Sequence, residues 1–249
     1  MRFESRASSG LRALLSNLTD ITLDGCIKIV QQLFRRRCVL CDAPVRHERI
    51  CTGCSAELPR MPPGRCTVCA VPLASGAVCG ACQHKPPAFE RVWAAFAYDF
   101  PVDALIHAFK YGRRLALAPV LGEMLAGCTA PEADALMPMP LSPQRLYERG
   151  FNQALEIARV LSRRYRLPLE ATWCRKVIET APQASLPWKE RAKNVRRAFV
   201  CDAPVTGLRI AVVDDVLTTG ATLNELARVL LKAGAASVTG WVVARTLPR

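Results

Sequence analysis

Two adjacent carboxylates and a loop of small residues form the most distinctive chemical pattern of the chain. Asp214 and Asp215 stand at the end of a hydrophobic run, residues 210–213, which has the composition of a buried strand. A loop of threonine, glycine and alanine, residues 218–222, follows and leads into apolar residues at helical spacing. Backbone N–H groups at a helix N-terminus attract a phosphate dianion, and threonine hydroxyls add donors. Because carboxylates at a strand end can accept hydrogen bonds from ribose hydroxyls, this order predicts a site for a phosphorylated sugar.

Two other interpretations of the same residues remain open. The acid pair could simply end a strand while Thr218 or Thr219 caps a helix. One aspartate could instead bind Mg²⁺ in a nucleotide hydrolase, although the chain has no G-x-x-x-x-G-K-[ST] loop to hold a triphosphate. The whole string, V-V-D-D-V-L-T-T-G-A-T, resembles the 5-phosphoribosyl-1-pyrophosphate (PRPP) motif of type I phosphoribosyltransferases. That resemblance implies an α/β fold in which a parallel sheet is flanked by helices.

Eight of the 12 cysteines occur as four C-x-x-C pairs. Nine residues separate the first pair from the second, and nine separate the third from the fourth, so the pairs form an internal repeat. Two C-x-x-C turns supply the four thiolates of a tetrahedral Zn²⁺ site, which is closed to substrate and therefore structural. Equal spacing favours sequential over interleaved pairing. The predicted zinc ligands are Cys38, Cys41, Cys51, Cys54, Cys66, Cys69, Cys79 and Cys82.

Composition limits the class of protein. At 249 residues and 51% hydrophobic content, the chain can form a packed core, and it contains no apolar run of membrane-spanning length. The N-terminus lacks the apolar stretch of a secretory signal, so we expect a cytoplasmic protein with reduced cysteines. The formal net charge of +13 favours polyanionic ligands such as pyrophosphate or nucleic acid.

The alternation of strand and helix patterns predicts a parallel sheet with helices on both faces. Strand patterns occur at residues 92–98, 135–137, 172–177, 199–200, 210–213 and 237–244, and helical patterns at 102–111, 115–125, 152–164 and 222–233. We therefore expect a leader of uncertain order at residues 1–37, a double zinc ribbon at 38–88 and the α/β domain at 89–249.

Two further segments carry groups suited to binding phosphate. The first is the turn after residues 135–137, which is rich in arginine and amide side chains that can point toward phosphates. The second is the polar connection at residues 176–197, whose length is typical of a lid. Residues 145–200 contain 13 Arg and Lys against 5 Asp and Glu, which is +8 of the total +13. Several of these arginines belong to exposed helix faces, but the positive charge is concentrated where pyrophosphate would leave.

The chain resembles the ComF family in four motifs: the cysteine module, P-M-P-L-S with R-x-x-x-R-G-F-N-Q-A, T-A-P-Q-A-S-L with R-x-x-N-V, and the PRPP string. ComF proteins are competence-associated and phosphoribosyltransferase-like, and are linked to the handling of incoming single-stranded DNA. The resemblance covers residues 38–245. It implies catalytic roles for Asp214, Asp215 and Arg149. It also implies PRPP contacts from Asp214, Asp215, Thr218, Thr219, Gly220, Ala221, Thr222, Ser142, Asn152, Gln153, Gln183, Arg191 and Asn194.

These observations lead to three hypotheses about function. The first is Mg²⁺-dependent phosphoribosyl transfer from PRPP to an unidentified acceptor. The second is a non-catalytic accessory factor that binds single-stranded DNA or competence helicase and processing proteins, and the third is a PRPP sensor without turnover. Purine-salvage enzymes of this fold usually have an aspartate where Thr218 stands, which argues against ordinary 6-oxopurine salvage. The N-terminus shows no glutaminase nucleophile, which argues against a complete glutamine amidophosphoribosyltransferase.

Overall fold

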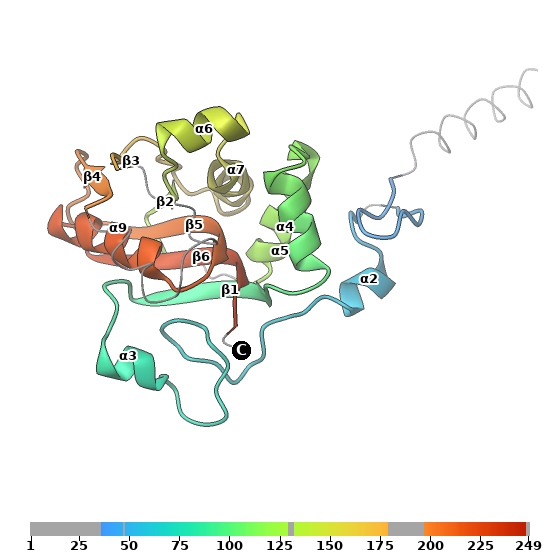
Figure 1. Ribbon diagram of the computed structural model, residues 1–249, viewed down its shortest axis with the longest axis horizontal. Coiled ribbons are helices and arrows are strands. Elements are labelled where there is room, and N and C mark those ends of the chain that lie inside the picture. Colours follow the sequence, from blue (N-terminus) through green and yellow to red (C-terminus); the bar gives the residue numbers. More distant parts are fainter. Residues whose placement is uncertain (1–35, 47, 129–131, 179–196, 248–249) are drawn as a thin grey trace, which may run out of the picture. The chain divides into compact units, whose positions relative to one another are not determined.

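The structure is a computed structural model that describes residues 36–46, 48–128, 132–178 and 197–247 (Figure 1). Contacts divide the chain into two compact units, Met1–Glu57 and Leu58–Arg249. The first predicted cysteine set therefore belongs to one unit, and the second set belongs to the same unit as the sheet. The domain boundaries expected at residues 37 and 88 stay predictions. Among the described residues, no helix is long and apolar enough to cross a membrane.

Four parallel strands form the central sheet of the larger unit, as the alternating pattern predicts. They are β1 (Arg91–Ala97), β2 (Ala135–Pro138), β5 (Arg209–Leu217) and β6 (Ser237–Arg245), in the spatial order β1-β6-β5-β2. Of the two central strands, β6 is almost wholly buried and most of β5 is buried, as expected for a sheet that is covered on both faces. The predicted fold class, a parallel sheet flanked by helices, is thus confirmed.

Helices cover opposite faces of the sheet. A Cβ added at Gly240 of β6 would lie 2.5 Å from Leu223 Cδ2, so α9 (Ala221–Lys232) packs directly on the strand backbone. The next residue, Trp241, points to the other face, where its ring contacts Tyr165 of α7 (Gln153–Tyr165) with centroids 5.7 Å apart. Helix α5 (Ala118–Ala126), which follows the short 3₁₀ helix Leu115–Leu117, packs beside α7.

Two elements differ from the sequence expectation. The strands β3 (Cys174–Lys176) and β4 (Phe199–Cys201) pair with each other in antiparallel orientation instead of joining the parallel sheet. The segment expected as a turn contains a helix, α6 (Pro143–Arg149), with Ser142 as its N-cap. Proline at the first position of a helix after a serine cap is a recognised start signal, and it explains why α6 forms here. Helix α4 (Val102–Lys110) lies where it was expected.

The central strand β5 continues beyond the hydrophobic run that predicted it. It includes both aspartates and ends at Leu217, because β6 still pairs with it at Asp214↔Val242 and Val216↔Ala244. The neighbouring strand β2 stops earlier, at the pair Pro138↔Val213. Beyond this point β5 has a strand on one side only, which leaves its other edge open to side chains from elsewhere.

Candidate functional site

The acid pair lies on β5, at the part of the strand that has lost its neighbour β2. Asp215 is 5% exposed, and its Oδ1 lies 2.9 Å from the Nζ of Lys110, the last residue of α4. Asp214 is half-buried, and its Oδ1 accepts a hydrogen bond from the Asp215 backbone N–H at 2.9 Å. The two carboxylates therefore lie close together but differ in their partners, because in the described part of the chain only Asp215 contacts a cation.

These contacts give the two carboxylates different electrostatics. Burial, followed by the negative charge of Asp215, raises the pKa of Asp214 to about 7. Burial lowers the pKa of the Lys110 ammonium, whereas the negative charge of Asp215 raises it. The effect of Asp215 outweighs burial, so the pKa of Lys110 lies above its ordinary value. The site thus combines a lysine whose pKa is raised, paired with Asp215, and a second carboxyl group whose pKa lies near neutrality.

The loop after β5 has the geometry expected of a phosphate-binding turn. Gly220, with φ of 79°, is the N-cap of α9, and a residue with a side chain would be strained in this conformation. The Ala221 backbone N–H donates to Thr219 Oγ1 at 3.2 Å. Since α9 is a 12-residue helix, its N-terminal N–H groups and dipole favour an anion at this loop.

The segment after β2 positions its predicted residues mainly through helix caps. Ser142, which is buried, accepts the Arg145 N–H at the start of α6, and Asn152 Oδ1 accepts the N–H groups of Ala154 and Leu155 at the start of α7. Asn152 Nδ2 also donates to the Met139 carbonyl at 3.1 Å, which ties α7 to the end of β2.

Arg149, at the end of α6, is held by two contacts. Its Nη1 donates to Gln153 Oε1 at 2.9 Å, and its guanidinium lies over the Tyr111 ring at 5.7 Å. Gln153 is buried, and among the described residues its Nε2 has no hydrogen-bond partner. Gln153 thus orients the Arg149 guanidinium, whose positive charge acts on Asp214.

A single cavity of about 550 Å³ brings these segments together. Its size suits a ligand of the dimensions of a phosphorylated sugar. Of the predicted site residues, Arg149, Asp214, Asp215, Thr218, Gly220, Ala221 and Thr222 line the cavity, whereas Ser142, Asn152, Gln153 and Thr219 are not among its lining residues. Gln183, Arg191 and Asn194 lie outside the described residues.

Sequence reasoning missed several groups that line the same cavity. Lys110 and Tyr111 come from the end of α4, Arg113 follows them, and Tyr98 follows β1. Lys176, the first residue of the polar connection singled out in the sequence, also lines the cavity; it ends β3 and is buried. A lysine in the last turn of an amphipathic helix normally indicates a solvated helix end. Only the fold brings Lys110 to Asp215, and the sequence contains no local signal for this contact.

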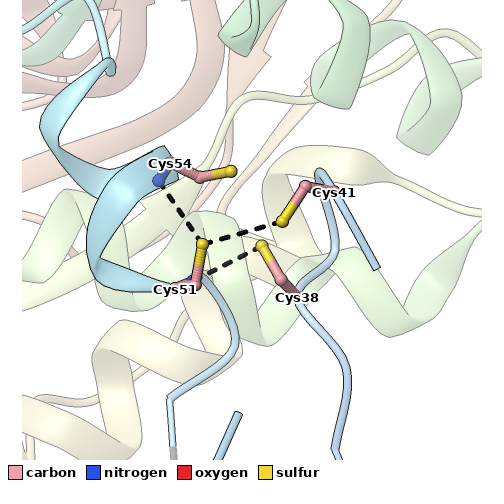
Figure 2. Close-up of side chains that lie close together, drawn as sticks. All are labelled: Cys38, Cys41, Cys51 and Cys54. Atoms are coloured by element: carbon pink, nitrogen blue, oxygen red, sulfur yellow. Dashed lines mark hydrogen bonds between the residues drawn. The ribbon is translucent and has the colours of Figure 1, made fainter. Parts of the chain in front are cut away.

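The eight predicted metal ligands form two sets of four in sequential order, Cys38 to Cys54 and Cys66 to Cys82. Within each set all sulfur atoms lie within 4.8 Å of one another, and the Sγ atoms of Cys41 and Cys51 are 3.7 Å apart (Figure 2). Four sulfurs at 2.3 Å from a tetrahedral Zn²⁺ would be separated by about 3.8 Å. Both sets therefore fit a closed structural zinc site, and sequential pairing is confirmed.

The two sets share the same local scaffold. Backbone N–H groups of Cys51 and Cys79 donate to the sulfurs of Cys38 and Cys66 at 3.4 and 3.3 Å. Despite burial, such backbone hydrogen bonds lower the pKa of Cys38 to about 6 and that of Cys66 to about 7. A short helix follows the third cysteine of each set, α2 (Thr52–Ala56) and α3 (Gly80–His84). Thiolates stabilised in this way are ready to bind a metal ion.

Comparison with known proteins identifies the family. Residues 29–83 match the double zinc ribbon domain. The DNA utilization protein YhgH of Escherichia coli K12 is 35% identical over 173 residues, covering 66% of this chain and 75% of that protein. The competence protein F of Haemophilus influenzae is 29% identical over 229 residues, covering 87% of this chain and all of that protein. The chain belongs to the ComF family.

Part of this ComF-family chain is also similar to solved structures. A glutamine PRPP amidotransferase of B. subtilis is 24% identical over 51% of this chain and 26% of that one, with a TM-score of 0.36. A purine phosphoribosyltransferase of Pyrococcus horikoshii is 22% identical over 55% of this chain and 83% of that one, with a TM-score of 0.28. The relatives therefore identify the family of this chain, whereas the evidence on its chemistry comes from the residues that line the cavity.

Proposed function

We propose that this ComF-family protein binds PRPP in the cavity at the end of β5 and transfers its phosphoribosyl group to an acceptor. The observation that carries the proposal is that one cavity combines a helix N-terminus, a carboxylate pair and several cations. The 5-phosphate would bind at the loop of residues 218–222, where Gly220 allows the turn and α9 supplies N–H groups. The ribose hydroxyls would donate hydrogen bonds to Asp214 and Asp215.

The charge distribution of the cavity supports pyrophosphate as the leaving group. Five cationic side chains line the cavity, against three carboxylates. Lys110 is paired with Asp215, and Arg145 and Arg149 enter the cavity lining from α6. Arginine binds phosphate oxygens with two parallel hydrogen bonds, so α6 is suited to hold the pyrophosphate. The cations are Lys110, Arg113, Arg145, Arg149 and Lys176.

In this reaction the acceptor attacks C1 of the ribose while the C1–oxygen bond to pyrophosphate breaks, and the ring gains positive charge in the transition state. The carboxylates would stabilise that charge, and the arginines would stabilise the departing pyrophosphate. A Mg²⁺ ion bound to the pyrophosphate would neutralise part of its charge, and Asp214 offers the type of oxygen ligand that Mg²⁺ prefers.

Calorimetry tests the proposal directly. We expect PRPP with Mg²⁺ to bind the wild-type protein, and Asp214→Ala/Asp215→Ala to weaken binding by at least roughly 100-fold, since each lost bond to a charged group contributes about 1.5–3 kcal/mol. Asp134→Ala is the matched control, because Asp134 pairs with Arg209 at the opposite end of β5. A folded, zinc-loaded wild type that does not bind PRPP would rule out the proposal. If PRPP binds, release of pyrophosphate with candidate acceptors then separates a transferase from a sensor.

Single-stranded DNA is a second candidate ligand, favoured by the DNA-related names of the relatives and by exposed rings at the cavity and on α6. Tyr111 is 62% exposed and Tyr147 is 90% exposed, and Arg145 and Arg113 lie near them. Rings and cations of this kind bind single strands by stacking and by phosphate contacts. Proteins that process DNA are candidate partners of a chain that binds single strands in this way.

Filter binding with oligothymidine at several salt concentrations tests this candidate. We expect affinity to fall steeply with salt, and Tyr147→Ala to weaken binding roughly fivefold or more, because one stacked base contributes about 1–3 kcal/mol. Val177→Ala, another exposed apolar position, serves as the control. An absence of binding at low salt would exclude the DNA role and leave the PRPP proposal untouched.

A further inference from the structure

Arg245, the last residue of β6, is a buried cation. Its side chain is 3% exposed, and among the described residues no aspartate or glutamate forms an ion pair with it. Removal of a guanidinium from water is costly unless its charge is compensated and its N–H groups are bonded. The neighbours of Arg245 must therefore bond its N–H groups and compensate its charge.

The neighbours of Arg245 are backbone carbonyl groups from two parts of the same unit. Its Nε donates to the carbonyl of Cys69 at 3.0 Å, and Cys69 belongs to the second tetracysteine set. Its Nη1 donates to the carbonyls of Leu217, at 3.2 Å, and Thr218, and to that of Thr246 at 2.6 Å. One side chain thus connects a metal ligand to the peptide groups that begin the phosphate loop.

The missing negative charge is supplied by the second cysteine set. Zn²⁺ with four thiolates carries a net negative charge, and Arg245 contacts the backbone of one of these four ligands. A metal-loaded site therefore compensates the buried guanidinium and fixes the direction of the Cys69 carbonyl. Without the metal the four cysteines are no longer held around one ion, and both effects are lost.

The hydrogen bonds from Arg245 to the Leu217 and Thr218 carbonyls determine the direction in which the loop points its backbone N–H groups. In a trans peptide the carbonyl oxygen and the N–H of the following residue point in opposite directions. Because Arg245 holds the carbonyls of Leu217 and Thr218, it also fixes the N–H groups of Thr218 and Thr219, which point away from Arg245. Those N–H groups belong to the loop assigned to the 5-phosphate.

We propose that Arg245 is a positioning residue that couples metal occupancy of the second tetracysteine site to phosphate binding at the loop of residues 218–222. The first site, in the other unit, has no equivalent connection among the described residues. The inference depends on the proposed function only in that the loop is taken as the phosphate site. Loss of zinc from the second site would then weaken binding of a phosphorylated sugar even while the sheet remains folded.

The first experiment compares corresponding ligands of the two sites in the full chain, with ribose 5-phosphate as the probe. We expect Cys69→Ser to weaken binding about tenfold and to speed amide hydrogen exchange at residues 217–222. For Cys41→Ser, which removes the metal from the first site, we expect a change at least fivefold smaller. Cys128→Ser, outside both sites, should match the wild type. Equal effects of Cys69→Ser and Cys41→Ser would overturn the proposal.

A double-mutant cycle separates positioning from general support of the fold. Arg245→Lys retains the charge but cannot hold several carbonyls at once, so binding should weaken while zinc content measured by mass spectrometry is unchanged. In the Arg245→Lys background, Cys69→Ser should have little additional effect, because the connection is already broken. Additive losses would show that Arg245 does not transmit the effect.

Hydrogen exchange keeps the two proposals distinguishable. A wild type that does not bind ribose 5-phosphate or PRPP contradicts the proposed function, yet faster exchange at residues 217–222 in Cys69→Ser would still support the coupling. A wild type that binds both ligands equally well with and without metal in the second site contradicts the coupling alone.

Discussion

Lys110 and Asp215 form an ion pair that is largely shielded from water, with side chains 18% and 7% exposed. Asp214, one residue away, has no cation at hydrogen-bond distance among the described residues, and burial, followed by the negative charge of Asp215, raises its pKa to about 7. At the scale of single residues the cavity therefore combines a carboxylate that is paired with a lysine and one whose pKa lies near neutrality. Removing either feature has a measurable consequence.

Lys110→Met removes the cation and leaves Asp215 buried without a partner. We expect the free energy of unfolding to fall by roughly 3 kcal/mol, at the lower end of the cost of breaking a buried pair. Urea denaturation measures the change. Lys232→Met, at an exposed position, should change stability by less than about 0.5 kcal/mol. Recovery of most of the loss in Lys110→Met/Asp215→Asn would assign it to the unpaired charge, and a persistent loss would argue against that cause.

Asp214→Asn tests the raised pKa of Asp214. In the folded protein this group keeps its proton up to about pH 7, whereas in the unfolded chain it loses it near its ordinary value of 3.8. The folded state therefore binds more protons between pH 4 and 7, and wild-type stability falls as pH rises through this range. Asparagine cannot ionise, so the variant should melt a few degrees above the wild type at pH 8 and at the same temperature at pH 4. A difference in melting temperature independent of pH would contradict the assignment.

At the scale of elements, the helix caps connect the end of β2 to the cavity. Asn152 accepts two backbone N–H groups at the start of α7 and donates to the Met139 carbonyl. This arrangement determines the start of α7 and, through Gln153, the orientation of Arg149. Asn152 and Gln153, which are not among the lining residues, therefore act on the cavity through their neighbours.

Asn152→Ala should cost about 1–2 kcal/mol of unfolding free energy, the usual cost of a lost N-cap. It should also weaken PRPP binding, because Arg149 is held from the first residue of α7. Asn152→Asp separates the two roles, since it keeps the acceptor for α7 but loses the donor to Met139. Denaturation and calorimetry on both variants measure the effects. If Asn152→Ala weakens binding without any loss of stability, the side chain contacts the ligand itself.

The sequence predicts those features of this molecule that are encoded by residues close together in the chain. Amphipathic spacing predicts α7 and α9 correctly, and equal cysteine spacing predicts the two metal sites. The sequence places the end of β5 too early, at residue 213, because two aspartates rarely continue a strand. Pairing with β6 overrides that preference. The ion pair of Lys110 with Asp215 and the contacts of Arg245 join residues far apart in the chain, so no local pattern indicates them.

At the scale of the whole molecule, the two metal sites belong to different units. We expect zinc analysis to give two ions per chain, one for each set. Removing the first by Cys41→Ser should leave the main thermal transition in place, because that transition reports the sheet. Removing the second by Cys69→Ser should lower it, because residues near this set, such as Ala70 and Met61, belong to the core cluster of the sheet unit. Calorimetric scans that show the same shift for both variants would contradict this division.

The repeated scaffold has one further consequence, for how the two modules can vary. The turn after the second cysteine places Asp42 in the first module and Ala70 in the second in the same left-handed conformation, with φ of 61° at each. Asp42 is exposed and pairs with Arg37, whereas Ala70 is completely buried. Aspartate tolerates this conformation, but a carboxylate at position 70 would be placed in the core without water. The duplicated modules are therefore no longer interchangeable: the first can accept new surface residues, while the second is constrained by the core in which it is buried.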